Sequence, residues 1–171
     1  MQEVVRLEKL GISLPSIEAR GLSMCEEAEE VVIAEVGDDG RQHQLTPEAS
    51  SAWKRMKSAA RDEGVELFIV SAYRSIARQV EIIQAKLDKG ERIEDILRVS
   101  APPGFSEHHT GRAADVSTPQ SVALDIAFEQ TPAFSWLQRH AGKFCFRLSY
   151  PPDNAQGYQY EPWHWCYVAV Q

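Results

Sequence analysis

The sequence predicts an α+β fold in a single domain, with a small, mainly antiparallel sheet flanked by helices. Its 171 residues suffice for one hydrophobic core, whereas two cores would both be marginal. Helical and strand-like segments follow one another without regular βαβ alternation, which argues against a parallel sheet. A hydrophobic content of 43% with 25% charged residues is typical of a globular protein and excludes a disordered chain.

The first half of the chain is expected to contain a hairpin and a long helix. Residues 31–45 predict the hairpin, because Asp39-Gly40 follows the apolar run at 31–36 and favours the positive φ values of a tight turn before residues 41–45. The helix follows at once: Thr46 is suited to cap it, Pro47 suits its first position, and the apolar periodicity continues to Gly64.

A buried strand followed by a second helix comes next. Residues 65–70 are apolar and β-branched, as in a buried strand, and residues 75–90 carry apolar side chains at helical spacing. This order places Tyr73 and Arg74 at a strand-to-helix turn, a position that often carries functional groups. The rest of the chain predicts an irregular segment at 100–112, strands at 113–116, 144–150 and 164–170, and a helix at 131–142.

Charge and cysteine content restrict partners and compartment. A net charge of -7 without a basic run excludes nucleic acid as an expected partner, so an anionic ligand would need a specific arginine. The chain as given shows no signal-peptide pattern and no segment fit to span a membrane. Cys25, Cys145 and Cys166 are odd in number and form no CxxC pair. We therefore expect a cytoplasmic protein, or a periplasmic one if a leader has been removed.

Two short stretches combine imidazoles and carboxylates in a way that suits a metal. His108 and Asp115 lie seven residues apart across a glycine-containing turn, and His164 follows Glu161 by three. Two histidines and one carboxylate around an open position suit catalytic zinc, although iron or manganese can use the same set. Glu161 is then the candidate general base, and Arg74 the candidate for binding a carboxylate or an oxyanion. Each stretch alone is weak evidence, because such spacings arise often by chance.

Three motifs taken together are far more specific. They are, in order, Ser71-x-Tyr73-Arg74-Ser75, Ser106-x-His108-x-x-Gly111-x-Ala113-x-Asp115 and Glu161-Pro162-Trp163-His164. Their order and separations resemble those of the VanY-type D-alanyl-D-alanine carboxypeptidase family, zinc D,D- and L,D-carboxypeptidases of peptidoglycan. The resemblance covers about residues 45–170, so we expect a VanY-like zinc peptidase domain at 45–171. Residues 1–44, with the hairpin, are expected to be an N-terminal extension without an assigned role.

The resemblance implies a role for each matching residue. His108, Asp115 and His164 would bind Zn²⁺, and Glu161 would be the general base. Arg74 would meet the substrate carboxylate or the developing oxyanion. Further substrate contacts are implied for Ser106, Gln79, Tyr73 and Trp163.

Some positions of the chain differ from the family or remain free. His109 falls where the motif is unconstrained, so we expect an outer-sphere or surface histidine. Relatives often carry arginine where this chain has Ser149 and Cys166. Cys166 shares a strand face with His164, and we expect it to be buried and inert.

The resemblance leaves the substrate bond open. The preferred interpretation is removal of the terminal D-alanine from tetrapeptide muropeptides, an L,D-carboxypeptidase activity in cell-wall recycling. The alternatives are D,D-carboxypeptidase action on pentapeptides and an endopeptidase that cuts between L-alanine and D-glutamate. A metal-stabilised module that binds wall peptide without cutting is less favoured, because Glu161 accompanies all three ligands. Oligomeric state cannot be predicted.

Overall fold

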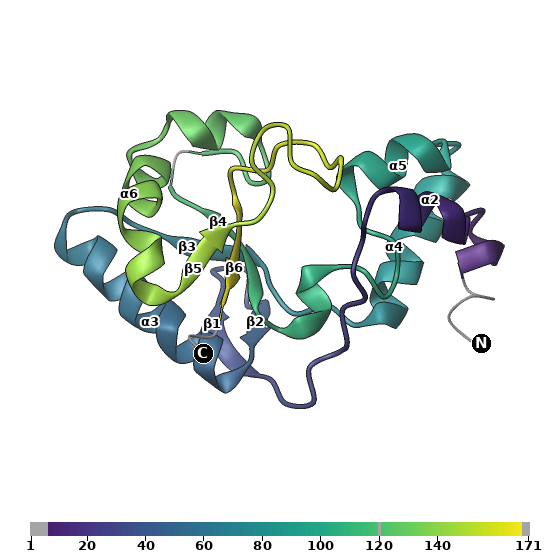
Figure 1. Ribbon diagram of the computed structural model, residues 1–171. Helices are drawn as coiled ribbons and strands as arrows, with labels where there is room; N and C mark the ends of the chain where they lie inside the picture. The colour runs from purple at the N-terminus through teal and green to yellow at the C-terminus, as the bar shows by residue number, and fades with distance from the viewer. Residues whose placement is uncertain (1–6, 120, 169–171) are drawn as a thin grey trace.

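The computed structural model describes residues 7–119 and 121–168 and has an antiparallel sheet at its centre (Figure 1). Four strands form this sheet in the order β3-β4-β6-β5. Their bounds are β3 Phe68–Ser71, β4 Ala113–Ser117, β5 Phe146–Leu148 and β6 His164–Tyr167. The predicted α+β fold with a small, antiparallel central sheet is therefore confirmed.

A separate hairpin precedes the central sheet. Its strands β1 (Val32–Val36) and β2 (Gln42–Leu45) pair antiparallel. The hairpin packs on α3 (Pro47–Asp62), where a carboxylate oxygen of Glu35 accepts a 3.0 Å hydrogen bond from Nε1 of the buried Trp53. The other oxygen of Glu35 accepts from the backbone N–H of Ile69 in β3. The hairpin predicted at residues 31–45 is thus present beside the outer strand of the sheet.

The main hydrophobic core lies between the central sheet and helices α3 and α6 (Pro132–His140). Both helices begin as predicted, because Thr46 and Thr131 accept a hydrogen bond from the third residue beyond them and a proline follows each threonine. Short 3₁₀ helices flank α6, η2 at Ile126–Gln130 and η3 at Ala141–Phe144. The core therefore fills one side of the sheet.

Three further helices form a second, smaller body around α4 (Figure 1). They are α2 Leu14–Ala19, α4 Ile76–Asp88 and α5 Ile93–Val99. Their apolar side chains form a separate buried cluster with Leu10, in which Ile83 and Ile96 are fully buried. Within the described ranges, no helix is long and apolar enough to cross a membrane.

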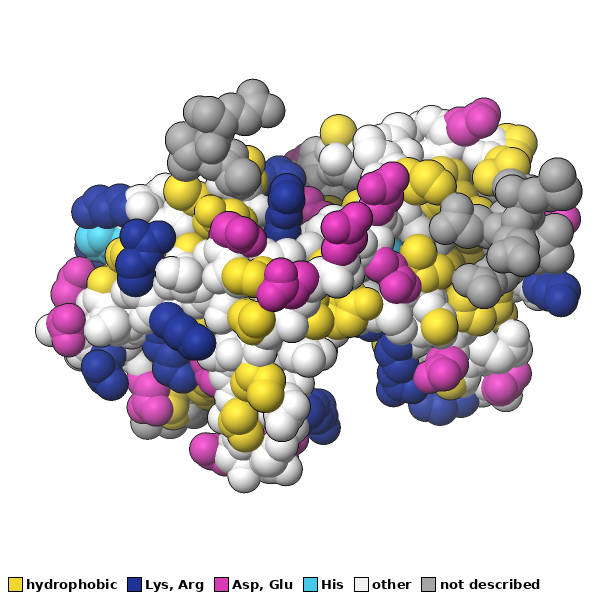
Figure 2. Space-filling model, turned by 90° about the horizontal axis from the view of Figure 1, so that it is seen from below, with side chains coloured by type: hydrophobic (Ala, Val, Ile, Leu, Met, Phe, Trp, Pro, Cys, Tyr) yellow, Lys and Arg dark blue, Asp and Glu magenta, His cyan; other side chains and the backbone are white. Residues whose placement is uncertain are grey.

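Two irregular segments join the second body to the sheet. The strap, residues 20–31, leads from α2 to β1 and carries exposed glutamates, and acidic side chains cross the middle of the face seen in Figure 2. The arch, residues 151–160, leaves the sheet and reaches α5, where the N–H of Gln159 donates to the carbonyl of Arg98 over 2.9 Å. The strap bonds to the backbone of His109 through the N–H of Ala28, and the arch lines the cleft described below.

Several predicted elements differ in extent from the observed ones. The strand predicted at 65–70 begins only at Phe68, because the turn at the end of α3 includes Val65, whose N–H bonds to Ala60. The strand predicted at 144–150 is shortened to β5, since η3 occupies its start and Cys145 has φ +62°. The strand predicted at 164–170 ends at Tyr167, and residues 169–170 lie outside the described ranges. Helices α2 and α5 were not predicted.

Candidate metal centre

Three neighbouring segments bring two imidazoles and one carboxylate together. His108 lies in η1 (Glu107–Thr110), and Gly111 then adopts φ +64°, which turns the chain directly into β4. Asp115 in β4 pairs in register with His164 at the start of β6. One donor atom from each of the three buried side chains lies within 4.8 Å of the others. Sheet register and the turn at Gly111 thus assemble the group that the motif predicted.

The ring of His108 is oriented by a backbone carbonyl. Its Nδ1 atom lies 2.7 Å from the carbonyl oxygen of Ala72, to which it can only donate a proton. Its Nε2 atom faces Asp115 Oδ2 at 3.3 Å. A neutral His108 therefore presents the lone pair of Nε2 to the cluster.

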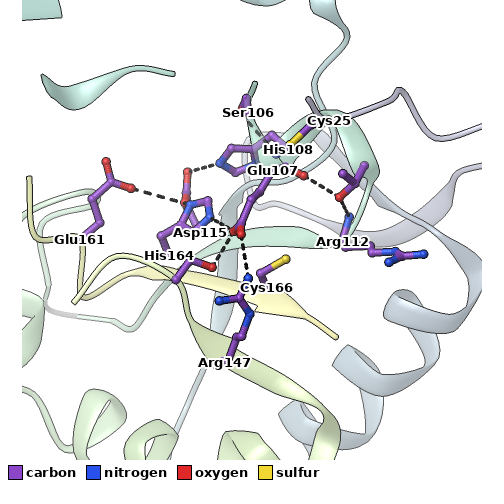
Figure 3. Close-up of polar contacts among 12 residues, drawn as sticks. Cys25, Ser106, Glu107, His108, Arg112, Asp115, Arg147, Glu161, His164 and Cys166 are labelled. Atoms are coloured by element: carbon purple, nitrogen blue, oxygen red, sulfur yellow. Dashed lines mark hydrogen bonds and ion pairs between the residues drawn. The ribbon is translucent and has the colours of Figure 1, made fainter. Parts of the chain in front are cut away.

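The ring of His164 is oriented by a carboxylate that sequence reasoning missed. Glu107 Oε2 lies 3.0 Å from Nε2 of His164, while Nδ1 on the other side lies 3.0 Å from Asp115 Oδ1 (Figure 3). Glu107 is itself held by Ser149, whose hydroxyl donates over 2.5 Å, and by Arg147 at 3.1 Å. Nδ1 of His164 is thus the nitrogen offered to the cluster.

Acid-base equilibria of the metal-free group reflect this packing. Burial raises the pKa of Glu107, but the hydrogen bond and charge of His164 outweigh it and bring the pKa to about 2. Burial likewise raises the pKa of Asp115, and the two histidines drive it below its usual range. Burial lowers the pKa of His164, yet hydrogen bonds to Asp115 and Glu107 raise it to about 10. His164 is therefore an imidazolium between two carboxylates at neutral pH.

The donor set fits a zinc ion. Tetrahedral zinc with ligand distances of about 2.0–2.2 Å has its ligands roughly 3.4 Å apart, a spacing that the three clustered donor atoms can adopt with small side-chain movements. Both imidazoles hydrogen-bond through the nitrogen that faces away from the cluster, as metal-binding histidines generally do. His108, Asp115 and His164 would leave a fourth position facing the cleft.

Glu161 lies beside this group without belonging to it. Its Oε2 atom is 3.7 Å from Nδ1 of His164, and its side chain is 15% exposed. Burial raises the pKa of Glu161 to about 7, although the positive charge of His164 opposes the rise. A carboxyl group with a pKa near neutrality can both accept and return a proton.

Arg74 approaches from the turn between β3 and α4. Its guanidinium donates to the side-chain oxygen of Gln79 over 2.8 Å and to the hydroxyl of Ser71 over 3.3 Å. Burial lowers the pKa of Arg74, and the carboxylates of Asp115 and Glu161 oppose this effect. Gln79 is fully buried, and its amide nitrogen also donates to Ala101. The predicted contact between Gln79 and the substrate stays a prediction. In the structure, the side chain of Gln79 contacts Arg74 and orients its guanidinium.

A cleft of about 660 Å³ opens onto these groups. The clustered donors, Glu161 and Arg74 line it together with three of the predicted substrate contacts, Ser106, Tyr73 and Trp163. Ser106 also caps η1 by accepting from the N–H of His108. The cleft thus collects all the predicted site residues except Gln79, which lies behind Arg74.

Two neighbours of the site are buried outside the cluster. His109 is fully buried, so the surface position considered for it is wrong; its Nδ1 lies 2.6 Å from the carbonyl oxygen of Arg74, and its Nε2 accepts from Gly104 N–H. Cys166 is 6% exposed, as expected, and burial raises the pKa of its thiol above the usual range. In the described part of the chain, neither side chain belongs to the three-donor group.

Comparison with known proteins agrees with the geometry. Residues 42–170 match the family described as VanY, D-alanyl-D-alanine carboxypeptidase. Over 128 residues the chain is 41% identical to YodJ of Bacillus subtilis (strain 168), a match that covers 72% of this chain and 46% of YodJ. The chain thus spans about half the length of that curated relative.

Two solved structures share the fold. The LdcB LD-carboxypeptidase has a TM-score of 0.73 and 37% identity, covering 83% of this chain and 69% of its own. A variant of the vancomycin-resistance D,D-pentapeptidase VanY, solved with Zn(II), has a TM-score of 0.64 and 28% identity, covering 82% and 79%. The match over residues 42–170 includes every motif of the site. The chain therefore belongs to the VanY D-alanyl-D-alanine carboxypeptidase family.

Proposed function

We propose that the protein is a zinc-dependent carboxypeptidase that removes the C-terminal D-alanine from peptidoglycan stem peptides. One observation carries this proposal: Glu161, with its pKa raised to about 7, lies 3.7 Å from a buried His-Asp-His group in a cleft that also contains Arg74. A proton acceptor, a metal site and a carboxylate-binding cation are the groups that a metal-dependent carboxypeptidase uses.

Each residue has a defined task in this reaction. His108, Asp115 and His164 would hold a zinc ion, which would supply Lewis-acid chemistry by lowering the pKa of water and polarising a carbonyl. Glu161 takes the proton of the attacking water and returns it to the leaving amine of D-alanine. Arg74 pairs with the terminal carboxylate of the substrate, and its bond to Gln79 fixes the orientation of the guanidinium.

We propose the L,D-bond of tetrapeptide muropeptides as the preferred substrate bond. The 37% identity between this chain and the LdcB LD-carboxypeptidase supports this preference. Action on the D,D-bond of pentapeptides is the nearest alternative. A cytoplasmic role in wall recycling, where such tetrapeptides would be met, belongs to the same proposal.

An endopeptidase would need a cleft that accepts peptide on both sides of the cut. The arch contacts α5 through the bond from Gln159 to Arg98, and Gln159 lines the cleft. If this contact closes one end of the cleft to peptide, it favours the carboxypeptidase over the endopeptidase. A module that binds without cutting would not need a carboxyl group with the raised pKa of Glu161.

Mass spectrometry of purified protein with defined tetrapeptide and pentapeptide muropeptides tests the proposal, with and without a zinc chelator. We expect chelator-sensitive loss of a single alanine, faster from the tetrapeptide. Faster loss from the pentapeptide would replace L,D- by D,D-specificity. Internal fragments would indicate an endopeptidase, and intact peptides with zinc-loaded protein would refute catalysis.

A further inference from the structure

Arg20 ties the second body to the arch from a position outside the family match at 42–170. Its Nε atom donates to the carbonyl of Gln156 in the arch over 2.8 Å. Its Nη1 atom donates to the carbonyl of Leu97 in α5 over 3.0 Å. One side chain therefore contacts both the arch and α5, at residues Gln156 and Leu97, which are 59 residues apart in sequence.

A row of aromatic rings in edge-on and tilted contact, here called the ring stack, leads from Arg20 to the metal centre. The guanidinium carbon lies 4.4 Å from the centroid of the Tyr158 ring. Tyr158 packs on Tyr150 with 4.8 Å between ring centroids, and Tyr150 packs on His164 with 4.7 Å between them. Buried rings at these distances cannot shift independently, because protein interiors are close-packed. The position of Arg20 is thereby linked to that of a candidate zinc ligand.

The backbone around Tyr150 reinforces this link. The N–H of Glu161 donates to the carbonyl of Tyr150 over 3.1 Å, and the N–H of His164 donates to the carbonyl of Glu161 over 3.1 Å. A movement of Tyr150 would therefore displace both the proton acceptor and the ring of His164.

We propose that Arg20 is a positioning residue of the metal centre: by clamping the arch to α5 and packing on Tyr158, it holds His164 and Glu161 in their working geometry. Its kinetic consequence rests on the proposed function, whereas its effect on zinc binding does not. Helix α2 and the strap are then parts of the active unit, although they precede the region that matches the family.

Arg20→Ala is the first variant, and the zinc dissociation constant measured by competition with a chromophoric chelator is the first readout. We expect the constant to rise about tenfold, the lower end of the effect seen when groups that orient metal ligands are lost. The matched control is Arg92→Ala, because Arg92 is an exposed arginine that pairs with the exposed Glu94 at 3.4 Å. Zinc affinity of Arg20→Ala equal to that of the control would overturn the proposal.

The strap has other attachments that allow Arg20→Ala to fold. The N–H of Cys25 donates to the carbonyl of Gly104 over 2.7 Å, and the N–H of Ala28 donates to the carbonyl of His109 over 2.8 Å. The buried cluster that contains Ile83 does not include Arg20. Circular dichroism establishes that the variant is folded at the assay temperature. If it is not, Tyr158→Leu decides the question, because it interrupts the ring stack and retains both hydrogen bonds of Arg20.

The ring stack makes its own prediction. The hydroxyl of Tyr158 is buried without a hydrogen-bond partner among the described residues, so Tyr158→Phe should bind zinc as the unchanged protein does. Tyr158→Leu should weaken zinc binding as much as Arg20→Ala does. Equal affinities for the leucine and phenylalanine variants would exclude the ring stack as the connection.

Kinetic measurements test the positioning role of Arg20 separately from the proposed function. If the unchanged protein releases alanine, Arg20→Ala should lower kcat about tenfold and leave KM within about twofold, because Arg20 acts through the metal centre and is not among the residues that line the cleft. A purely structural role would leave kcat per folded molecule unchanged, and that result would overturn the proposal. If the unchanged protein binds zinc but releases no alanine, the proposed function fails and the zinc comparison still decides the role of Arg20.

Discussion

Nε2 of His164 lies 3.0 Å from Oε2 of Glu107, on the side of the ring opposite to Asp115. The carboxylate is itself fixed by the hydroxyl of Ser149 and by the guanidinium of Arg147. A ring held through one nitrogen offers the other nitrogen in a defined direction, which reduces the cost of ordering the site when a metal binds. Glu107 thus determines which nitrogen of His164 can bind a metal.

Glu107→Gln should weaken zinc binding. The amide keeps the shape of the side chain but loses the charge that His164 and Arg147 both use, so we expect the zinc dissociation constant to rise about 10- to 100-fold. Chelator competition measures this constant. The control is Glu63→Gln, because Glu63 faces His140 at 4.0 Å on the exposed surface. Equal zinc affinity in the two variants would remove Glu107 from the metal centre.

Zinc binding should release a proton and strengthen as the pH rises. The pKa of His164 in the metal-free protein is raised to about 10, so Nδ1 carries a proton at neutral pH that a metal must displace. Affinity should therefore increase about tenfold per pH unit between pH 7 and 9. Isothermal titration calorimetry in buffers of different ionisation enthalpy counts the protons. Binding without proton release would show that His164 is neutral in the metal-free protein.

The site could be predicted largely because its ligands lie in local motifs. Asp115 lies within one predicted strand and His164 begins another. Gly111 marks the turn that brings His108 close to both. Glu107 was missed because its role depends on His164, which is 57 residues away. Its position directly before a ligand was the available signal, but an acid beside a histidine is usually a solvated residue.

The second body shows where sequence reasoning fails for physical reasons. Helices α2 and α5 have six and seven residues, too few to show a helical period. Their stability comes from packing on α4, which no local pattern reports. The same holds for Arg20, whose partners at Leu97 and Gln156 are brought near it only by the fold.

Glu161→Gln should abolish turnover and leave zinc bound. Glutamine cannot accept the proton of the attacking water, and Glu161 is not one of the three clustered donors. His108→Ala should lose both zinc and activity, because it removes a ligand. Activity assays with metal analysis of the same samples distinguish the two variants. Residual turnover of Glu161→Gln close to that of the unchanged protein would refute its role as the base.

Gly111→Ala should destabilise the fold and loosen the ligand pair that the turn joins. Gly111 has φ +64°, and a Cβ atom there would lie 3.1 Å from the Cβ of Ala28 and 3.2 Å from Thr46 Cγ2. We expect a loss of about 2–3 kcal/mol in the free energy of unfolding. Gly90→Ala is the control, because it has φ +84° with nothing within 4 Å and should lose only about 1 kcal/mol. Denaturant unfolding measures the stability of both variants. Equal losses of stability would show that the strap, which contains Ala28, moves aside to make room for the added methyl group.

Arg74→Ala should affect peptides according to the charge at their C-terminus. A guanidinium that pairs with the terminal carboxylate contributes only when that carboxylate is present, so kcat/KM on free peptides should fall about 100-fold. On peptides with an amidated C-terminus, which lack the charge, the unchanged protein should already be slow and the variant should differ from it little. The control is Arg139→Ala, because Arg139 is exposed on α6, where its Nε atom donates to the carbonyl of Ser135 in the same helix. An equal loss of kcat/KM on free and amidated peptides would mean that Arg74 stabilises the oxyanion and does not bind the terminal carboxylate.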